Sequence, residues 1–302
     1  MSADIEGRRF RAWDQNSMAE PARKWVLIAK YNYLRYLKNP IAYLVLIAIL
    51  LGFFVGSAEM GLFDFNERPP RDIAQYLPLM AVMTALVCGG VVLLGAPSFS
   101  EDIRFNALLF YFSRPLRARD YLWGKLAFLI SGSLGVGVLA VGGLSMVLLV
   151  TGVPYDQSSD YSYFADPDTT VDSALEFLPY MLLAIAGFLS MTWFTIGTVT
   201  LASVYTKRAW HAMLGWVAIM FGWTMFAALV FGYEGSGKAE FLFSPGGWMS
   251  LVFDHPVNAM YESARTSFQL PLVIAALVLA AGLGTAALAL SKRRIAQMEG
   301  TL

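Results

Sequence analysis

Residues 76–97 read YLPLMAVMTALVCGGVVLLGAP, and residues 98–125 continue as SFSEDIRFNALLFYFSRPLRARDYLWGK. The first segment holds 22 residues without a charged side chain, whereas the second carries eight Asp, Glu, Arg and Lys residues. A helix needs about 20 apolar residues to cross the roughly 30 Å hydrocarbon core of a bilayer. The junction after residue 97 therefore predicts a transmembrane helix that leaves the membrane into a charged loop.

The same apolar pattern recurs along the whole chain. Of its 302 residues, 57% are hydrophobic and 15% are charged, whereas a soluble domain carries about 25% charged residues. Asn39 and Pro40 suit the cap and the first position of a helix, because proline lacks an N–H that would be unpaired there. We expect an all-α integral membrane protein with one transmembrane domain over residues 39–291. Its six predicted spans are residues 41–57, 76–97, 121–152, 177–204, 210–232 and 270–290.

The distribution of basic residues predicts the orientation of these spans. Six spans place both termini on one side, together with the second and fourth connecting loops. The segments on that side hold 18 of the 22 Lys and Arg residues. Cytoplasmic loops are enriched in Lys and Arg, so we expect both termini, including a short tail at residues 292–302, in the cytoplasm.

A basic amphipathic helix is predicted over residues 22–38, after a disordered cytosolic tail at residues 1–21. One uncharged arc of its helical wheel carries Trp25, Val26, Ala29, Tyr33, Tyr36 and Leu37. Such a helix suits the headgroup layer of a membrane, where it lies flat. We assign Trp25, Tyr33 and Tyr36 to the membrane interface, together with Lys125 at the start of the third span. The alternative is an ordinary basic flank that happens to be helical.

The predicted spans lack buried ionisable groups. Lys125 and His211 lie only at span ends. Ion-coupled transporters and intramembrane enzymes use carboxylates or histidines at membrane depth, so both classes are disfavoured. Cys88 is the single cysteine, and no Cys/His cluster indicates a metal site. The zero net charge gives no indication of a nucleic-acid partner.

The chain also lacks a convincing ATP site. Residues 232–239, GYEGSGKA, approach the phosphate-loop pattern G-x-x-x-x-G-K-[ST]. Ala239 lacks the hydroxyl that binds Mg²⁺, and a predicted transmembrane helix, not a strand, precedes the segment. We interpret it as a flexible loop on the outer side. Any ATP-driven activity then requires a separate polypeptide.

The loop at residues 98–120 carries the strongest functional signal. Ser98 and Glu101 fit a capping box, and Asp102 favours the positive end of a helix, so we expect a short helix to begin at Ser98. Pro115 disfavours helical geometry at Arg114, which predicts an arginine-rich turn before the third span. The charged residues, the serine and the proline that mark this loop are Glu101, Asp102, Arg104, Ser113, Arg114, Pro115, Arg117 and Arg119.

At these positions the chain resembles the ABC-2 permease family of ABC transporters. That family has a glutamate at the end of the second span, then Ser-Arg-Pro-(Leu/Val)-x-Arg, then Tyr-x-x-Gly-Lys at the start of the third span. The counterparts here are Glu101, the segment 113–119 and the segment 121–125. The Lys-Gly-Thr that often follows the glutamate is replaced by Asp-Ile-Arg-Phe-Asn-Ala. The layout of a basic elbow helix and six spans also resembles the family over essentially the whole chain.

The resemblance implies a transport mechanism. The loop would be a coupling helix whose eight marked residues, Glu101 to Arg119, contact a separate ABC ATPase subunit. That subunit would be present in two copies that hold ATP and Mg²⁺. Closure of the ATPases would open a path between this chain and a second permease copy or paralogue, and the expected direction of transport is export. The chain itself would need no cofactor and would not be an enzyme. The implied location is the plasma membrane of a bacterium or archaeon.

Two outer segments are further candidates. Residues 241–253 are apolar but interrupted at Pro245, Gly246 and Gly247, and the resemblance implies an outer gate there. Residues 153–176 are acidic, which suits a solvated loop or a contact with a periplasmic or extracellular accessory protein.

Other interpretations of the loop stay open. Its charges are also compatible with ordinary juxtamembrane residues, and the chain with a non-transporting membrane anchor or sensor that recruits a cytosolic partner. The sequence does not indicate a substrate or the composition of a permease dimer.

Overall fold

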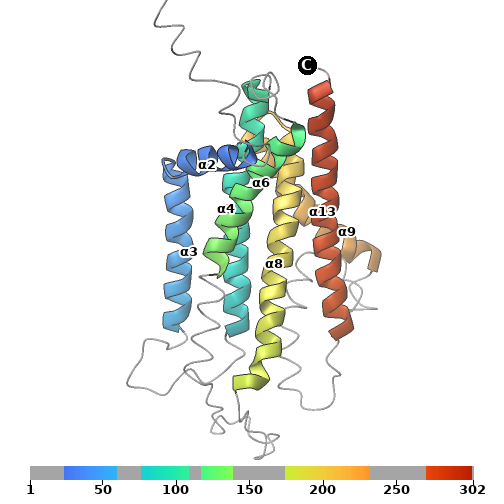
Figure 1. Cartoon of the computed structure of the whole chain (residues 1–302). Coiled ribbons are helices and arrows are strands. Elements are labelled where there is room, and N and C mark those ends of the chain that lie inside the picture. Colours follow the sequence, from blue (N-terminus) through green and yellow to red (C-terminus); the bar gives the residue numbers. More distant parts are fainter. Residues whose placement is uncertain (1–23, 60–75, 109–116, 139–173, 232–269, 301–302) are drawn as a thin grey trace, which may run out of the picture.

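The computed structural model describes residues 24–59, 76–108, 117–138, 174–231 and 270–300, and all seven of its assigned elements in these segments are α-helices. Figure 1 shows them as a bundle with one helix lying across its upper end. The helices are α2 (Lys24–Tyr36), α3 (Pro40–Glu59), α4 (Tyr76–Arg104), α6 (Ala118–Gly137), α8 (Ala174–Tyr205), α9 (Ala209–Phe231) and α13 (Leu270–Gly300). The all-α prediction is confirmed for the described residues.

Three of these helices are long and apolar enough to cross a bilayer. They are Ala81–Arg104 of α4, Leu182–Tyr205 of α8 and Val273–Glu299 of α13. The pair Trp25–Tyr36 and Pro40–Gly52, bent by 79°, makes a fourth if it is counted as one broken span. The protein is therefore a candidate multi-pass membrane protein with three or four spans in its described part, and the six spans remain a prediction.

The bend between α2 and α3 is built from local hydrogen bonds. The side-chain Oδ1 of Asn39 accepts a bond of 3.0 Å from the N–H of Ile41, as expected of a helix cap before Pro40. The hydroxyl of Tyr43 donates to the carbonyl of Leu37 at 2.6 Å. These contacts turn α2 so that it lies across the end of the bundle (Figure 1).

Helix α4 corrects the prediction that a new helix begins at Ser98. The helix runs unbroken through Pro97 to Arg104, and the hydroxyl of Ser100 donates to the carbonyl of Ala96 at 2.7 Å. Packing against neighbouring helices outweighs the capping signal at Ser98, because such packing lets a membrane helix tolerate proline. Phe99, only 1% exposed, takes part in this packing. The break comes instead at Asn106, which has a φ of 53°.

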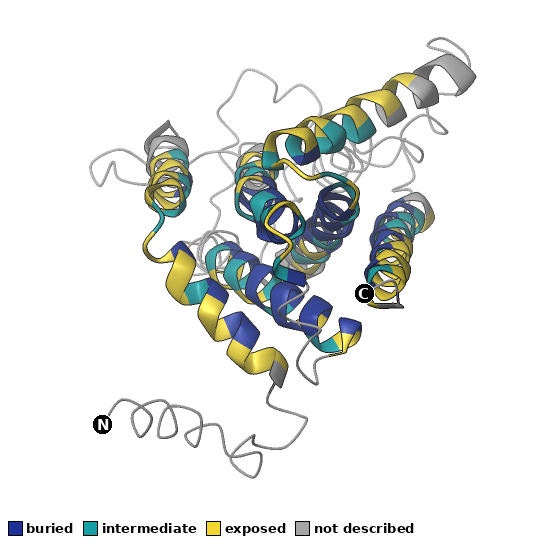
Figure 2. Cartoon of the chain, turned by 90° about the horizontal axis from the view of Figure 1, so that it is seen from above, coloured by how far each residue is buried: buried dark blue, intermediate teal, exposed yellow. Residues whose placement is uncertain are grey.

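Helices α8 and α13 pack most closely in the middle of the bundle. A Cβ atom built on Gly197 would lie 2.3 Å from the carbonyl oxygen of Gly284, and one on Gly284 would lie 2.9 Å from the carbonyl oxygen of Trp193. Glycine is needed here because no side chain fits between the two backbones. Figure 2 shows that the inward faces of the bundle are buried, whereas α3 and α13 expose much of their outer surface.

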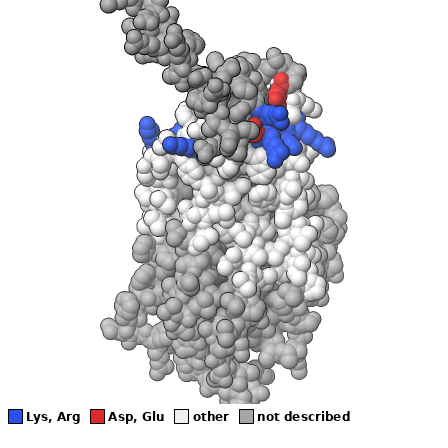
Figure 3. All heavy atoms as spheres, viewed as in Figure 1, with Lys and Arg blue, Asp and Glu red and all other residues white. Residues whose placement is uncertain are grey.

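The exposed basic residues gather at one end of the bundle (Figure 3). We call this the basic end; it comprises α2, the C-terminal ends of α4, α8 and α13, and the N-terminal ends of α6 and α9. Its exposed Lys and Arg residues in the described segments are Lys30, Arg35, Lys38, Arg104, Arg117, Arg119, Lys207, Arg208, Lys292, Arg293 and Arg294.

Candidate functional site: a buried ion pair at the basic end

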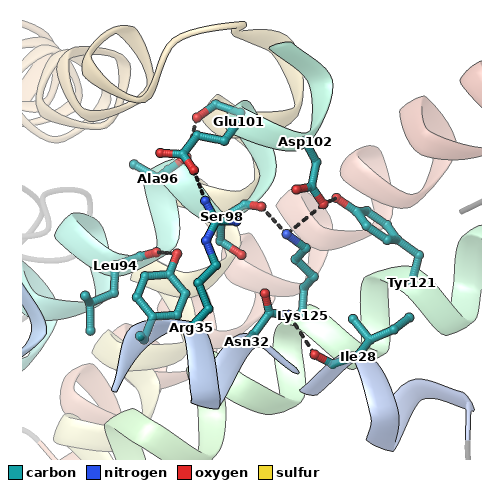
Figure 4. A network of polar contacts seen from close by, with 12 residues as sticks. Ile28, Asn32, Arg35, Leu94, Ala96, Ser98, Glu101, Asp102, Tyr121 and Lys125 are labelled. Carbon is teal, nitrogen blue, oxygen red and sulfur yellow. Dashed lines mark hydrogen bonds and ion pairs between the residues drawn. The ribbon is translucent and has the colours of Figure 1, made fainter. Parts of the chain in front are cut away.

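The candidate site is centred on an ion pair between α4 and α6. The Nζ of Lys125 lies 2.8 Å from Oδ2 of Asp102, and the two side chains are only 1% and 8% exposed. Asp102 is in the last turn of α4, and Lys125 is in the second turn of α6. The ammonium of Lys125 also donates to the backbone carbonyl of Ser98 (Figure 4). The pair therefore joins the helix that precedes residues 105–117 to the helix that follows them.

Aromatic groups complete the surroundings of this pair. The hydroxyl of Tyr121 donates to Oδ2 of Asp102 at 2.9 Å. The rings of Phe99 and Tyr121 have their centres 5.6 Å and 5.5 Å from the Lys125 nitrogen, within the range of cation–π attraction. A buried ion pair is tolerated only when further hydrogen bonds compensate the loss of water. The carboxylate of Asp102 and the ammonium of Lys125 both meet this condition.

A close helix contact seats α2 on α6 next to the ion pair. A Cβ atom built on Gly124 would lie 2.7 Å from Cβ of Ile28 and 2.8 Å from the carbonyl oxygen of Trp25. Gly124 thus lets α2 approach α6 directly beside Lys125. The side-chain amide of buried Asn32 finds its hydrogen-bond partner within α2, because its Nδ2 donates to the carbonyl of Ile28 at 3.0 Å.

Two tyrosines of α2 extend its contact with α6. The ring of Tyr36 stacks on Phe128 with centres 4.6 Å apart and planes at 7°, and Tyr33 meets the same ring edge-on at 5.0 Å. The hydroxyl of Tyr36 donates to the carbonyl of Leu94 in α4 at 2.6 Å. Helix α2 is therefore held by both helices of the ion pair.

A second, more exposed ion pair links α2 to α4. The guanidinium of Arg35 contacts the carboxylate of Glu101, and their side chains are 41% and 32% exposed. Partial burial lowers the pKa of Arg35, but the neighbouring Glu101 carboxylate outweighs this effect, so the pKa is raised overall. Arg35 stays charged at any physiological pH, and water screens this pair more than the buried one.

The structure divides the predicted partner-contacting residues into three groups. Glu101 and Asp102 bind side chains of this chain. Arg104, Arg117 and Arg119 are exposed, and the guanidinium of Arg104 lies 5.3 Å from the ring centre of Phe105. The remaining residues of that loop, Ser113, Arg114 and Pro115, lie outside the described residues. The predicted outer gate, Pro245, Gly246 and Gly247, also lies outside them.

The residues assigned to the membrane interface also divide. Trp25 is 39% exposed, and Tyr33 is partly exposed although its ring packs on Phe128, so both keep surface outside the bundle. Tyr36 and Lys125, in contrast, are only 6% and 1% exposed, so neither is available to a membrane surface. The helical wheel of α2 did not predict the burial of Tyr36, because α4 and α6 determine which face of α2 is buried. Asn32 and Tyr36, four residues apart, lie on that buried face.

The sequence motif contains Tyr121, Gly124 and Lys125, but it predicted no contact for the first two and placed Lys125 at the membrane interface. One signal was available: Tyr121 and Lys125 are four residues apart and therefore share a face of a helix. Charged groups at membrane depth pair with one another, and Asp102 is a nearby acidic partner. Arg35 carried no comparable signal, because its partner is 66 residues away.

The arrangement is suited to mechanical linkage between helices. Among the described residues, no group of three or more His, Cys, Asp or Glu side chains is placed to hold a metal ion. The polar groups of the site bind one another and join α2, α4 and α6 where α4 ends and α6 begins. A displacement of either helix end would therefore be passed to the neighbouring helices.

Comparisons with protein-family models, with curated proteins and with solved structures found no match to this chain.

Proposed function

We propose that the chain is the membrane-spanning subunit of an ATP-driven transporter of the ABC-2 type. The ATPase is a separate polypeptide that docks on the loop at residues 105–117. The observation that carries this proposal is the buried ion pair of Asp102 and Lys125, because it clamps together the two helices between which the loop runs. The resemblance at residues 101–125 supports the same assignment.

The clamp gives the loop the mechanical role that coupling requires. A partner that moves the loop would displace α4 and α6 as one unit, since Lys125 bonds to both Asp102 and Ser98. The contact of Gly124 with Ile28 carries α2 along. A ligand can bias a conformational equilibrium only through contacts that differ between the states, and ATP binding on the partner would supply that bias.

The charge distribution supports docking on this face. Arg104 and Arg117 flank the loop and are exposed, so an acidic groove on an ATPase would complement them. In this proposal the basic end faces the cytosol, where ATP is available, and both termini lie there. The direction of transport is proposed to be export, and the transporter is proposed to contain two permease chains and two ATPase chains.

Co-purification tests the proposal. The tagged chain, extracted in mild detergent from its native membrane, should recover a partner that carries the phosphate-loop pattern G-x-x-x-x-G-K-[ST]. The double variant Arg104→Ala/Arg117→Ala should lower recovery of that partner at least tenfold. The matched control is Lys207→Ala/Arg208→Ala, which removes two exposed charges from the turn between α8 and α9 at the same end.

Three outcomes oppose the proposal in different ways. Equal recovery from the loop variant and the control would place the docking site elsewhere. Recovery of a cytosolic partner without a phosphate loop would identify a membrane anchor or sensor instead. Recovery of no partner by the wild-type chain would contradict the assignment to a multi-subunit transporter.

A further inference from the structure

A groove of about 680 Å³ lies between α6, α8 and α13, in the size range of sites for small molecules. Its walls are almost entirely apolar, and Leu189 and Val278 are exposed at 42% and 64%, so it opens on the outer surface of the bundle. Six of the residues that line it are Ile130, Leu134, Leu189, Trp193, Val278 and Ala281. The groove is apart from the ion pair of Asp102 and Lys125.

The wall formed by α13 leads from the groove to a basic residue. Ala281, Lys292 and Glu299 are separated by 11 and 7 positions, and at 3.6 residues per turn all three lie on one face of the helix. An independent contact fixes where that face points: Oε2 of Glu299 accepts a 3.2 Å bond from the N–H of Ala118 at the start of α6. Lys292 therefore lies on the side of α13 that faces α6, between the groove and the basic end.

The wall formed by α6 carries a matching pair. Arg119 and Trp123 precede Ile130 by 11 and 7 positions, so all three share one face of α6. Both Arg119 and Trp123 are exposed. On both α6 and α13, the helix face that lines the groove therefore carries a basic residue toward the basic end. On α6 the same face also carries Trp123.

The contact between Glu299 and Ala118 brings the two faces together at the basic end. Helix α6 begins there and α13 ends there (Figure 1). Lys292 precedes Glu299 by two helical turns, and Trp123 follows Ala118 by five residues, so both lie within about two turns of this contact. Gly124, next to Trp123, contacts α2, which lies across the same end (Figure 1).

We propose that this groove binds an acyl chain of an anionic phospholipid whose phosphate lies between Arg119 and Lys292. The apolar groove lies about 16 Å below Lys292, counted as 11 residues along α13, at the depth of the acyl chains. Tryptophan is favoured at the interface, and basic side chains attract anionic headgroups. Within the described segments neither Arg119 nor Lys292 has an ion-pair partner, so both charges are available to the phosphate. This proposal assigns Arg119 to lipid rather than to an ATPase, and it does not depend on the transport function.

Native mass spectrometry tests the headgroup contact. The purified full chain is titrated with phosphatidylglycerol and with phosphatidylcholine that carry identical acyl chains. The wild type should retain phosphatidylglycerol preferentially, and Lys292→Gln should weaken that binding about fivefold, as expected for one basic residue near a membrane surface. The matched control is Arg293→Gln, since Arg293 is also exposed but lies about 100° around the helix from Lys292. Equal retention of both lipids, or equal losses in the two variants, would overturn the proposal.

A second pair of variants tests the acyl-chain contact. Ala281→Phe fills the groove and should remove the retained phosphatidylglycerol, whereas Ala286→Phe, at an exposed position on another face of α13, should not. Both variants should elute as the wild type does in size-exclusion chromatography. Undiminished lipid binding by Ala281→Phe would contradict the proposal. Loss of a dimer in that variant, without loss of lipid, would show that the groove is occupied by a second copy of this chain.

Discussion

The basic end and the middle of the bundle are held together by different physical means. At the basic end, Lys125 and Asp102 join α4 and α6 through a buried ion pair. In the middle, Gly197 and Gly284 join α8 and α13 through backbone contact without any charge. The first contact depends on the chemistry of two side chains, and the second depends on the absence of side chains.

This difference separates the site of linkage from the scaffold. An ion pair that loses one partner leaves an unpaired buried charge, so the clamp responds strongly to small chemical changes. A glycine contact responds only to added volume. Substitution of one side chain should therefore disturb the junction of α4 and α6 more than the junction of α8 and α13, unless the new side chain is larger. The two contacts should therefore fail in different ways when they are mutated.

The largest effect is expected at the ion pair. Lys125→Met should lower the free energy of unfolding by about 3–5 kcal/mol, because it leaves the Asp102 carboxylate buried without a counter-charge. Denaturant titration of the protein in detergent micelles measures the change. Lys125→Met/Asp102→Leu should recover at least half of that loss, since an apolar pair removes the uncompensated charge. No recovery in the double variant would mean that shape, not charge, holds α4 against α6.

An intermediate effect is expected at the glycine contact. Gly197→Ala should lower the free energy of unfolding by about 1–3 kcal/mol, because the added methyl group overlaps the carbonyl of Gly284 and the backbones must separate. Gly282 is the matched control, as a Cβ atom there would meet nothing within 4 Å. Gly282→Ala should leave stability unchanged or raise it by up to about 1 kcal/mol through helix propensity. Equal outcomes for the two substitutions would refute the close approach of α8 and α13.

The smallest effect is expected at the exposed pair. Arg35→Gln should change the free energy of unfolding by less than about 1 kcal/mol, because water screens its contact with Glu101. The same titration, repeated at low and high salt, should show that the small difference from wild type shrinks as salt increases. A loss as large as that of Lys125→Met would show that the second pair is part of the clamp and not peripheral to it.

The sequence predicted the helical framework because that framework depends on local composition. Uncharged runs predict where helices lie, and Asn39 followed by Pro40 predicts where α3 begins, because a cap acts within one turn. The helix start at Ser98 was predicted wrongly, since the same local signal was outweighed by packing of α4 against its neighbours. Phe99, almost fully buried, belongs to that packing and not to a new surface helix.

The contacts of the site depended on pairs of residues that no local pattern connects. The motif residues Tyr121 and Lys125 were recognisable, but their joint partner Asp102 is given only by the antiparallel arrangement of α4 and α6. Gly197 and Gly284 are two of 26 glycines, and nothing in their neighbourhoods distinguishes them. The face that α2 buries was likewise decided by Gly124, which lies on another helix.

Topology tests the central claim most directly, because the proposed docking loop must face the compartment that contains ATP. A single cysteine placed by Arg117→Cys, in a Cys88→Ala background, is exposed to a membrane-impermeant maleimide in intact cells and in inside-out vesicles. The proposal predicts labelling in the inside-out vesicles alone. Labelling from the outside of intact cells would contradict both the orientation of the basic end and the docking of an ATPase there.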